Sequence, residues 1–138
     1  MSGWALDALA GAIPDFDSLR DRRIDTTLDV VAEAFNTDRR ALTAANLRTK
    51  DKTLMVARQL AAYLLHEDCG LSFKESATRM GWRNHTSAKD AFDHIAGLTK
   101  EASSQKLRDV IGSIREMVDV DMKKMTIDKP NPPKIRMN

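Results

Sequence analysis

Residues 72–98 read SFKESATRMGWRNHTSAKDAFDHIAGL, and this stretch carries the pattern that sets the fold. Ser72 is a suitable N-cap for a short first helix, and Gly81 then breaks the chain. Asn84 or Thr86 can begin a second helix, whose apolar residues recur at helical spacing. Two helices joined by a tight glycine turn have the pattern of a helix-turn-helix.

Five polar residues with hydrogen-bond donors stand in a row at the start of the second helix: Arg83, Asn84, His85, Thr86 and Ser87. A recognition helix presents its N-terminal residues to base edges in the major groove. There Arg can pair with guanine, Asn with adenine, and the Thr methyl can touch the thymine methyl. The helix N-terminus also offers amides to a phosphate. Capping alone is the competing interpretation, because Ser, Thr and Asn are common caps.

The rest of the chain carries helical periodicity, with no strand alternation and no internal repeat. The longest expected helix covers about Lys52–Asp68, and Gly70 supplies the left-handed position after its end. A short helix before a turn at Pro14 is also expected. Further helices are predicted near residues 16–24, 27–35 (capped by Thr26), 37–45 (capped by Thr37) and 102–124. The chain is therefore predicted to be all-α.

The composition of the 138 residues bounds the function. A single cysteine, Cys69, excludes a disulfide framework and a multi-cysteine zinc site. His66 and His94 lack metal-ligand spacing, so no metal or cofactor is expected. Paired carboxylates, a nucleophile–base set and a phosphate loop are missing, which predicts a binding protein rather than an enzyme. The chain also lacks an export signal and an apolar run that could span a bilayer, which favours the cytoplasm.

Positive charge is concentrated in the middle of the chain. Residues 37–100 hold eleven basic and seven acidic residues, although the net charge of the whole chain is only +2. Five of these basic residues fall within fourteen positions: Arg39, Arg40, Arg48, Lys50 and Lys52. Such a run is either a solvated face or a surface that attracts nucleic acid.

The run from Gly81 to Ala91 resembles the signature of the C-terminal DNA-binding domain of DnaA, the bacterial replication initiator family. Upstream, the stretch ARQLAAYL at residues 57–64 is similar to a helix of that family, and VVAEAF at 30–35 is similar to its opening. The resemblance covers roughly residues 24–100. It implies a helix-turn-helix of the Trp-repressor-like kind.

The resemblance implies a DNA-contacting role for ten residues. Five of them would meet bases and phosphates of the major groove: Arg83, Asn84, His85, Thr86 and Ser87, with Lys89 as a further contact. The basic loop that holds Arg48, Lys50 and Lys52 would reach an adjacent minor groove, with Lys50 or Arg48 the closest match to the arginine of the family. Arg58 would contact a phosphate. Asn84 replaces an acidic residue, Asp90 a histidine and Val56 an arginine of the family pattern, which indicates a different target sequence. The ATPase loop of the initiator is not found in the chain.

These observations divide the chain into an acidic helical extension (1–24), a DNA-binding domain (25–100), a C-terminal helix (101–125) and a disordered basic tail (126–138). We expect a double-stranded DNA-binding transcription regulator, an activator of phage-like or gene-transfer-agent genes, that is associated with the nucleoid. The alternatives are a replication modulator that competes for initiator sites and an adaptor that recruits a partner protein through the N-terminal segment or the C-terminal helix. The C-terminal helix either packs on its own domain or forms a dimer or partner surface, so the chain is expected to be a monomer or a homodimer.

Overall fold

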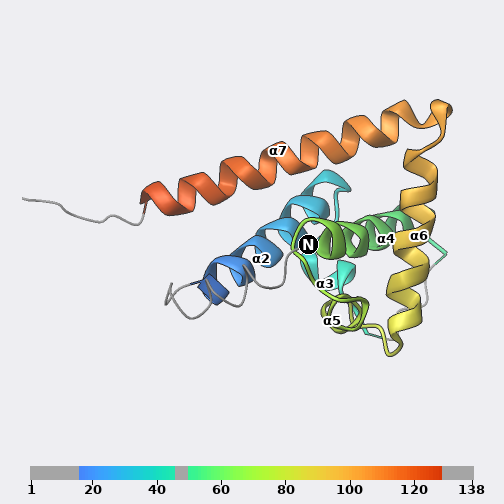
Figure 1. Cartoon of the computed structure of the whole chain (residues 1–138), viewed down its shortest axis with the longest axis horizontal. Helices are drawn as coiled ribbons and strands as arrows, with labels where there is room; N and C mark the ends of the chain where they lie inside the picture. The colour runs from blue at the N-terminus through green and yellow to red at the C-terminus, as the bar shows by residue number, and fades with distance from the viewer. Residues whose placement is uncertain (1–15, 46–49, 129–138) are drawn as a thin grey trace, which may run out of the picture.

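A computed structural model describes residues 16–45 and 50–128, and this part of the chain is helical, without a strand (Figure 1). This confirms the predicted all-α class, and the helix-turn-helix follows from α5 and α6. In chain order the elements are α2 (Phe16–Ala34), α3 (Arg39–Leu42), α4 (Lys52–Glu67), α5 (Phe73–Arg79), α6 (His85–Thr99), the 3₁₀ turn η1 (Ala102–Ser104) and α7 (Gln105–Asp128).

Helix α4 forms the centre of the core, and its bounds agree closely with the prediction. Leu60, Leu64 and Leu65 are buried in it, and α2, α3, α5 and α6 all pack against it. Gly70 follows its end with a φ of +73°, as expected. The apolar stripe is broad enough to contact helices on several sides, which is why α4 is central.

Helix α2 corrects two expectations. It is one continuous helix instead of two pieces, and Thr26 is a buried residue inside it instead of a cap. The helix also runs through the boundary expected between residues 24 and 25. Ile24 and Leu28 are buried on either side of Thr26, so packing against α4 and α7 keeps this segment helical. The helix and turn expected around Pro14 lie outside the described residues.

Helix α3 is shorter than expected and begins one residue later. Its cap is Asp38, whose Oδ1 accepts a 2.8 Å hydrogen bond from the backbone N–H of Ala41, so the prediction of Thr37 was wrong. The helix ends at Leu42 with Thr43 as its C-cap, and the chain that follows passes close to the turn before α6.

Helix α7 lies along one side of the molecule and packs on α2 (Figure 1). Ile111, Ile114 and Val118 are buried, so the helix packs back on its own domain, the first of the two alternatives. It begins after the turn η1 and continues to Asp128, slightly beyond the expected end; the remaining tail lies outside the described residues. In the described part of the chain, none of the helices combines the length and apolarity needed to span a bilayer.

Candidate nucleic-acid interface

Helix α5, the first helix of the pair, is fixed at its start by a reciprocal cap. Ser72 Oγ accepts a 3.0 Å hydrogen bond from the backbone N–H of Glu75, and Glu75 Oε1 accepts a 2.9 Å bond from the backbone N–H of Ser72. The latter bond is the main reason that the pKa of Glu75 lies below its ordinary value. The cap confirms Ser72 as the predicted start of the helix.

The turn between α5 and α6 requires glycine at position 81. Gly81 has a φ of +76°, and a Cβ added there would lie 2.5 Å from the carbonyl oxygen of Thr43 and 3.0 Å from the backbone nitrogen of Ala45. The next residue, Trp82, is half-buried against the core. The turn is therefore pressed against the backbone that leads out of α3.

Arg58 holds this junction together. Its Nε donates a 3.0 Å hydrogen bond to the carbonyl oxygen of Leu42, and its Nη2 donates 2.9 Å bonds to the carbonyl oxygens of Ala44 and Met80. The guanidinium carbon lies 5.4 Å from the ring centroid of Trp82. Burial lowers the pKa of Arg58 from its ordinary value.

These contacts give Arg58 a role in the fold, and the phosphate contact expected for it stays a prediction. Only 7% of the residue is exposed, and its Nε and Nη2 donate to the protein backbone. Arg58 is therefore a positioning residue that ties α4 to the segment after α3 and to the turn before α6. The sequence did carry the signal, because Arg58 lies within the apolar stripe of α4, between Ala57 and Leu60.

The structure brings the five polar residues at the start of α6 together on the surface. All of them are exposed: Arg83, Asn84, His85, Thr86 and Ser87. The helix behind them is anchored by Ala88, Ala91 and Ile95, which are buried. The polar side chains thus extend from a helical turn that the core holds in place.

Asn84 is the N-cap of α6. Its Oδ1 accepts a 2.9 Å hydrogen bond from the backbone N–H of Thr86, while the residue stays exposed. The Ser87 N–H donates to the carbonyl oxygen of Asn84 at 3.1 Å. Capping is therefore established. The side chain of Asn84 engages the Thr86 amide and its backbone carbonyl engages the Ser87 amide, and both amides were expected to be available to a phosphate.

The remaining predicted residues have different surroundings. Lys50 and Lys52 are exposed on either side of Asp51, whose side chain caps α4, and Arg48 lies outside the described residues. Lys89 is exposed and forms a 2.7 Å ion pair with Asp93, which raises its pKa.

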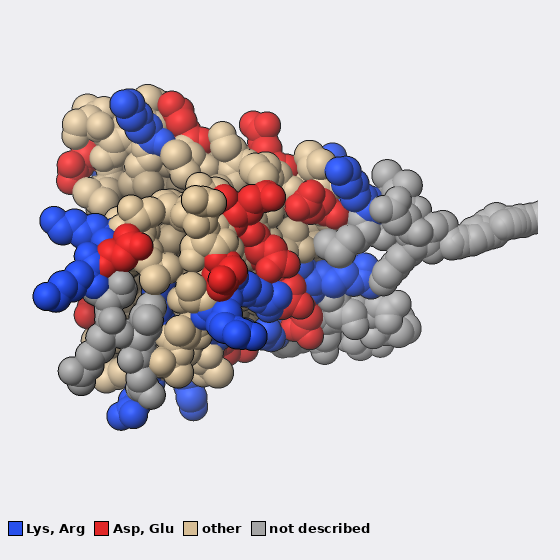
Figure 2. All heavy atoms as spheres, turned by 180° about the vertical axis from the view of Figure 1, so that it is seen from behind, with Lys and Arg blue, Asp and Glu red and all other residues tan. Residues whose placement is uncertain are grey.

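Charge is unevenly distributed over the face drawn in Figure 2. Basic side chains project from its left end, where α6 lies, and from its lower edge, while acidic side chains form a band across the middle; further basic side chains stand within this band and toward the right end. The close approach of Gly81 to Thr43 and Ala45 brings the backbone in the middle of the basic stretch of residues 39–52 next to the turn. The basic stretch and the turn before α6 are thus joined by this backbone contact.

His66 and Cys69, which were considered as metal ligands, form contacts within the fold instead. Nδ1 of His66 lies 2.7 Å from the carbonyl oxygen of Leu71, and its ring stacks on Phe73 at 4.1 Å between centroids. Cys69 is buried beside Thr27, and burial raises the pKa of its thiol. Among the residues that the structure describes, no group of three or more His, Cys, Asp and Glu is placed to hold a metal ion.

Comparison with known proteins supports the resemblance. Residues 24–95 match the family model described as the bacterial dnaA protein helix-turn-helix. The chromosomal replication initiator protein DnaA of Herpetosiphon aurantiacus is 28% identical to this chain over 115 residues, which are 80% of this chain and 23% of that protein. The chain thus spans less than a quarter of the length of this relative. No solved structure matches the chain.

Proposed function

Because this chain belongs to the bacterial DnaA helix-turn-helix family, and its helix-turn-helix supports DNA binding, we propose that it is a sequence-specific regulator of transcription. It reads the major groove of double-stranded DNA with the first turn of α6. The observation that carries this proposal is the exposure of five adjacent polar side chains, Arg83 to Ser87, on a helix that is anchored by buried residues. The shape of this end of the molecule suits a recognition helix.

Each element of the site has a role in the proposal. Arg83 supplies a fork of donors for a guanine edge, and Asn84, His85 and Thr86 offer further polar groups to neighbouring bases. Lys50 and Lys52 supply positive charge for phosphates beside the site, and Arg58 keeps the turn in position. We propose a binding role without catalysis, exerted on DNA in the nucleoid.

The test is a binding-site selection on random duplexes, followed by affinity measurements on the selected site and on unrelated DNA. Arg83→Ala is expected to lower affinity for the selected site by about 1–3 kcal/mol and to have little effect on unrelated DNA. Lys100→Ala is the control, because it removes one exposed positive charge at the C-cap of α6, at the other end of that helix from Arg83. Equal losses on both duplexes for Arg83→Ala would rule out base reading by this residue.

The regulatory part of the proposal has its own test. Genome-wide mapping of bound sites, combined with transcript levels in a strain lacking the protein, is expected to show binding upstream of genes whose transcription then falls. Phage-like or gene-transfer-agent genes are the targets we propose. Bound sites without a change in transcription would reject the regulatory role while leaving DNA binding intact.

A second candidate function is a replication modulator that occupies initiator sites. The similarity to a replication initiator over 80% of this chain favours this candidate. The test is competition with the full-length initiator for its own binding site in vitro. If this candidate function is correct, the chain displaces the initiator at stoichiometric concentrations. A chain that fails to bind that site excludes the function.

A further inference from the structure

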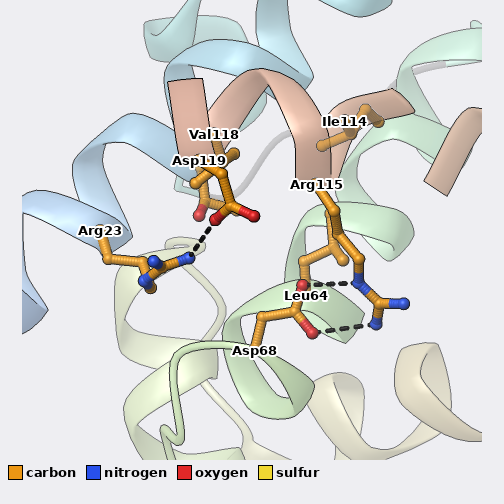
Figure 3. Close-up of a pocket in the computed structure, with 8 residues that line it drawn as sticks. Arg23, Leu64, Asp68, Ile114, Arg115, Val118 and Asp119 are labelled. Carbon is orange, nitrogen blue, oxygen red and sulfur yellow. Dashed lines mark hydrogen bonds and ion pairs between the residues drawn. The ribbon is translucent and has the colours of Figure 1, made fainter. Parts of the chain in front are cut away.

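One face of α7 attaches the helix to the rest of the molecule. Ile114 lines a pocket of about 260 Å³ between α7, α2 and α4, and Figure 3 shows two ion pairs among the residues around this pocket. Arg115 Nε lies 2.8 Å from Asp68 Oδ2, and Arg23 Nη1 lies 3.4 Å from Asp119 Oδ1. These contacts fix the orientation of α7, so the residues on its opposite face are held outward.

The outward face of α7 carries an apolar stripe. Val110, Met117 and Val120 are 40%, 39% and 51% exposed, and Ser113 lies between them. Their spacing of three, four and three residues is the one that lines up side chains along a helix in paired helices. These three account for half of the large apolar side chains exposed to this degree in the described residues. We call Val110, Ser113, Met117 and Val120 the outer stripe.

Charged residues beside the outer stripe indicate what covers it. Asp109, Glu116 and Lys123 are exposed and repeat at intervals of seven residues along one flank of the stripe. In a parallel pair in register, this flank of one helix faces the other flank of the partner helix, so Asp109 meets a buried residue, Ile114 of the partner subunit, and Glu116 meets a like charge, Asp121 of the partner subunit. An antiparallel copy instead places Asp109 next to Lys123 of the partner subunit, twice by symmetry, and only Glu116 next to its own copy.

The apolar residues fit the same antiparallel register. It places Val110 opposite Val120 of the partner subunit, and Ser113 opposite Met117 of the partner subunit. A small residue facing a large one allows the two helices to approach closely. Lys106 and Lys124 then face each other at the two ends of the contact, where solvent screens them.

We propose that the outer stripe binds a second copy of this chain, so that the two α7 helices pair antiparallel in a homodimer. The start of α6 lies on the opposite side of the molecule from α7 and stays accessible (Figure 1). This inference does not depend on the proposed function, because it rests on α7 alone.

The first test is sedimentation of the full chain over a concentration range. We expect a monomer–dimer equilibrium with a dissociation constant on the order of micromolar, because one helix per chain forms a small interface. Met117→Glu is expected to weaken the dimer by at least about tenfold, since it places two charges in the contact. Met55→Glu is the matched control, because Met55 is 46% exposed on α4 and should leave the equilibrium unchanged. A monomeric wild type, or equal effects of both variants, overturns the proposal.

The second test addresses the antiparallel register. Asp109→Lys and Lys123→Asp are each expected to weaken the dimer about tenfold, because each turns two attractive contacts into repulsive ones. Combining both substitutions restores the attraction and is expected to return the dissociation constant to near its original value. Glu116→Gln is expected to tighten the dimer. Circular dichroism of each variant checks that the fold is intact, and a folded double variant that stays as weak as the single ones overturns the antiparallel pairing.

Discussion

Position 81 shows how one residue fixes the geometry of the site. Its φ of +76° lies in the left-handed region, and the space where a Cβ would stand is occupied by the carbonyl oxygen of Thr43. Both facts make glycine necessary, and the contact that results presses the turn before α6 against the segment after α3. The position of the five polar side chains thus depends on a residue that has no side chain itself.

Gly81→Ala is expected to lower the free energy of unfolding by at least about 2 kcal/mol, because it combines left-handed strain with a clash against backbone. Gly97→Ala is the matched control, because position 97 is inside α6 and a Cβ added there would have nothing within 4 Å. Alanine there should stabilise the protein by roughly 0.5–1 kcal/mol. Urea unfolding of both variants measures the difference, and similar values would contradict the interpretation of Gly81.

The hydrogen bonds of Arg58 lead to a second prediction about a single residue. Arg58→Met removes the donors to three carbonyl oxygens and is expected to lower the free energy of unfolding by about 2–4 kcal/mol. Arg83→Ala, an exposed substitution, should stay within about 0.5 kcal/mol of wild type. Urea unfolding decides between a positioning role and a DNA contact. If the Arg58→Met variant is as stable as wild type but binds DNA more weakly, the result would favour a phosphate contact by Arg58 over the positioning role.

At the scale of elements, helices α5 and α6 are each defined by a cap and a buried face. Ser72 and Asn84 satisfy amides at the two helix starts, and Ala77 and Ala91 are buried where the helices pack together and against α4. Local hydrogen bonds therefore set where each helix begins, while packing sets how the pair is oriented. This division explains why the bounds of both helices were predictable.

The capping box makes the stability of the protein depend on pH. The folded state lowers the pKa of Glu75 below its ordinary 4.5, so the box contributes stability above that pH. This contribution is lost as the pH falls below 4.5 and through the folded-state pKa. Glu75→Gln is expected to reduce the difference in unfolding free energy between about pH 7 and about pH 3, as measured by urea titration. Glu67→Gln, another exposed acidic residue, is the control and should leave that difference unchanged.

At the scale of the whole molecule, α7 completes a core that the helix-turn-helix alone leaves open. Ile114 is 1% exposed and packs where α2 and α4 meet, far from the start of α6. The helix therefore supports the fold from the side opposite the proposed interface. Its outer stripe is left for association between chains.

Ile114→Ala is expected to lower the free energy of unfolding by about 2–5 kcal/mol, because it leaves a cavity in the core. Val110→Ala removes apolar atoms from the exposed side of the same helix and should change stability by less than about 0.7 kcal/mol. Thermal unfolding at low protein concentration, where the proposed dimer is dissociated, measures both. Comparable losses of stability in the two variants would contradict the assignment of a buried face and an exposed face to α7.

The amino-acid sequence was sufficient to predict the all-α class, the bounds of α4, α5 and α6, and the residues that start α6. These features depend on local chemistry: helical periodicity, caps such as Ser72, and a glycine turn. Three other features became clear only from the folded chain: α2 is unbroken at Thr26, Arg58 binds backbone carbonyls, and one particular face of α7 is buried. Each of these depends on which distant segment packs against the residue, and neighbours in sequence do not carry that information.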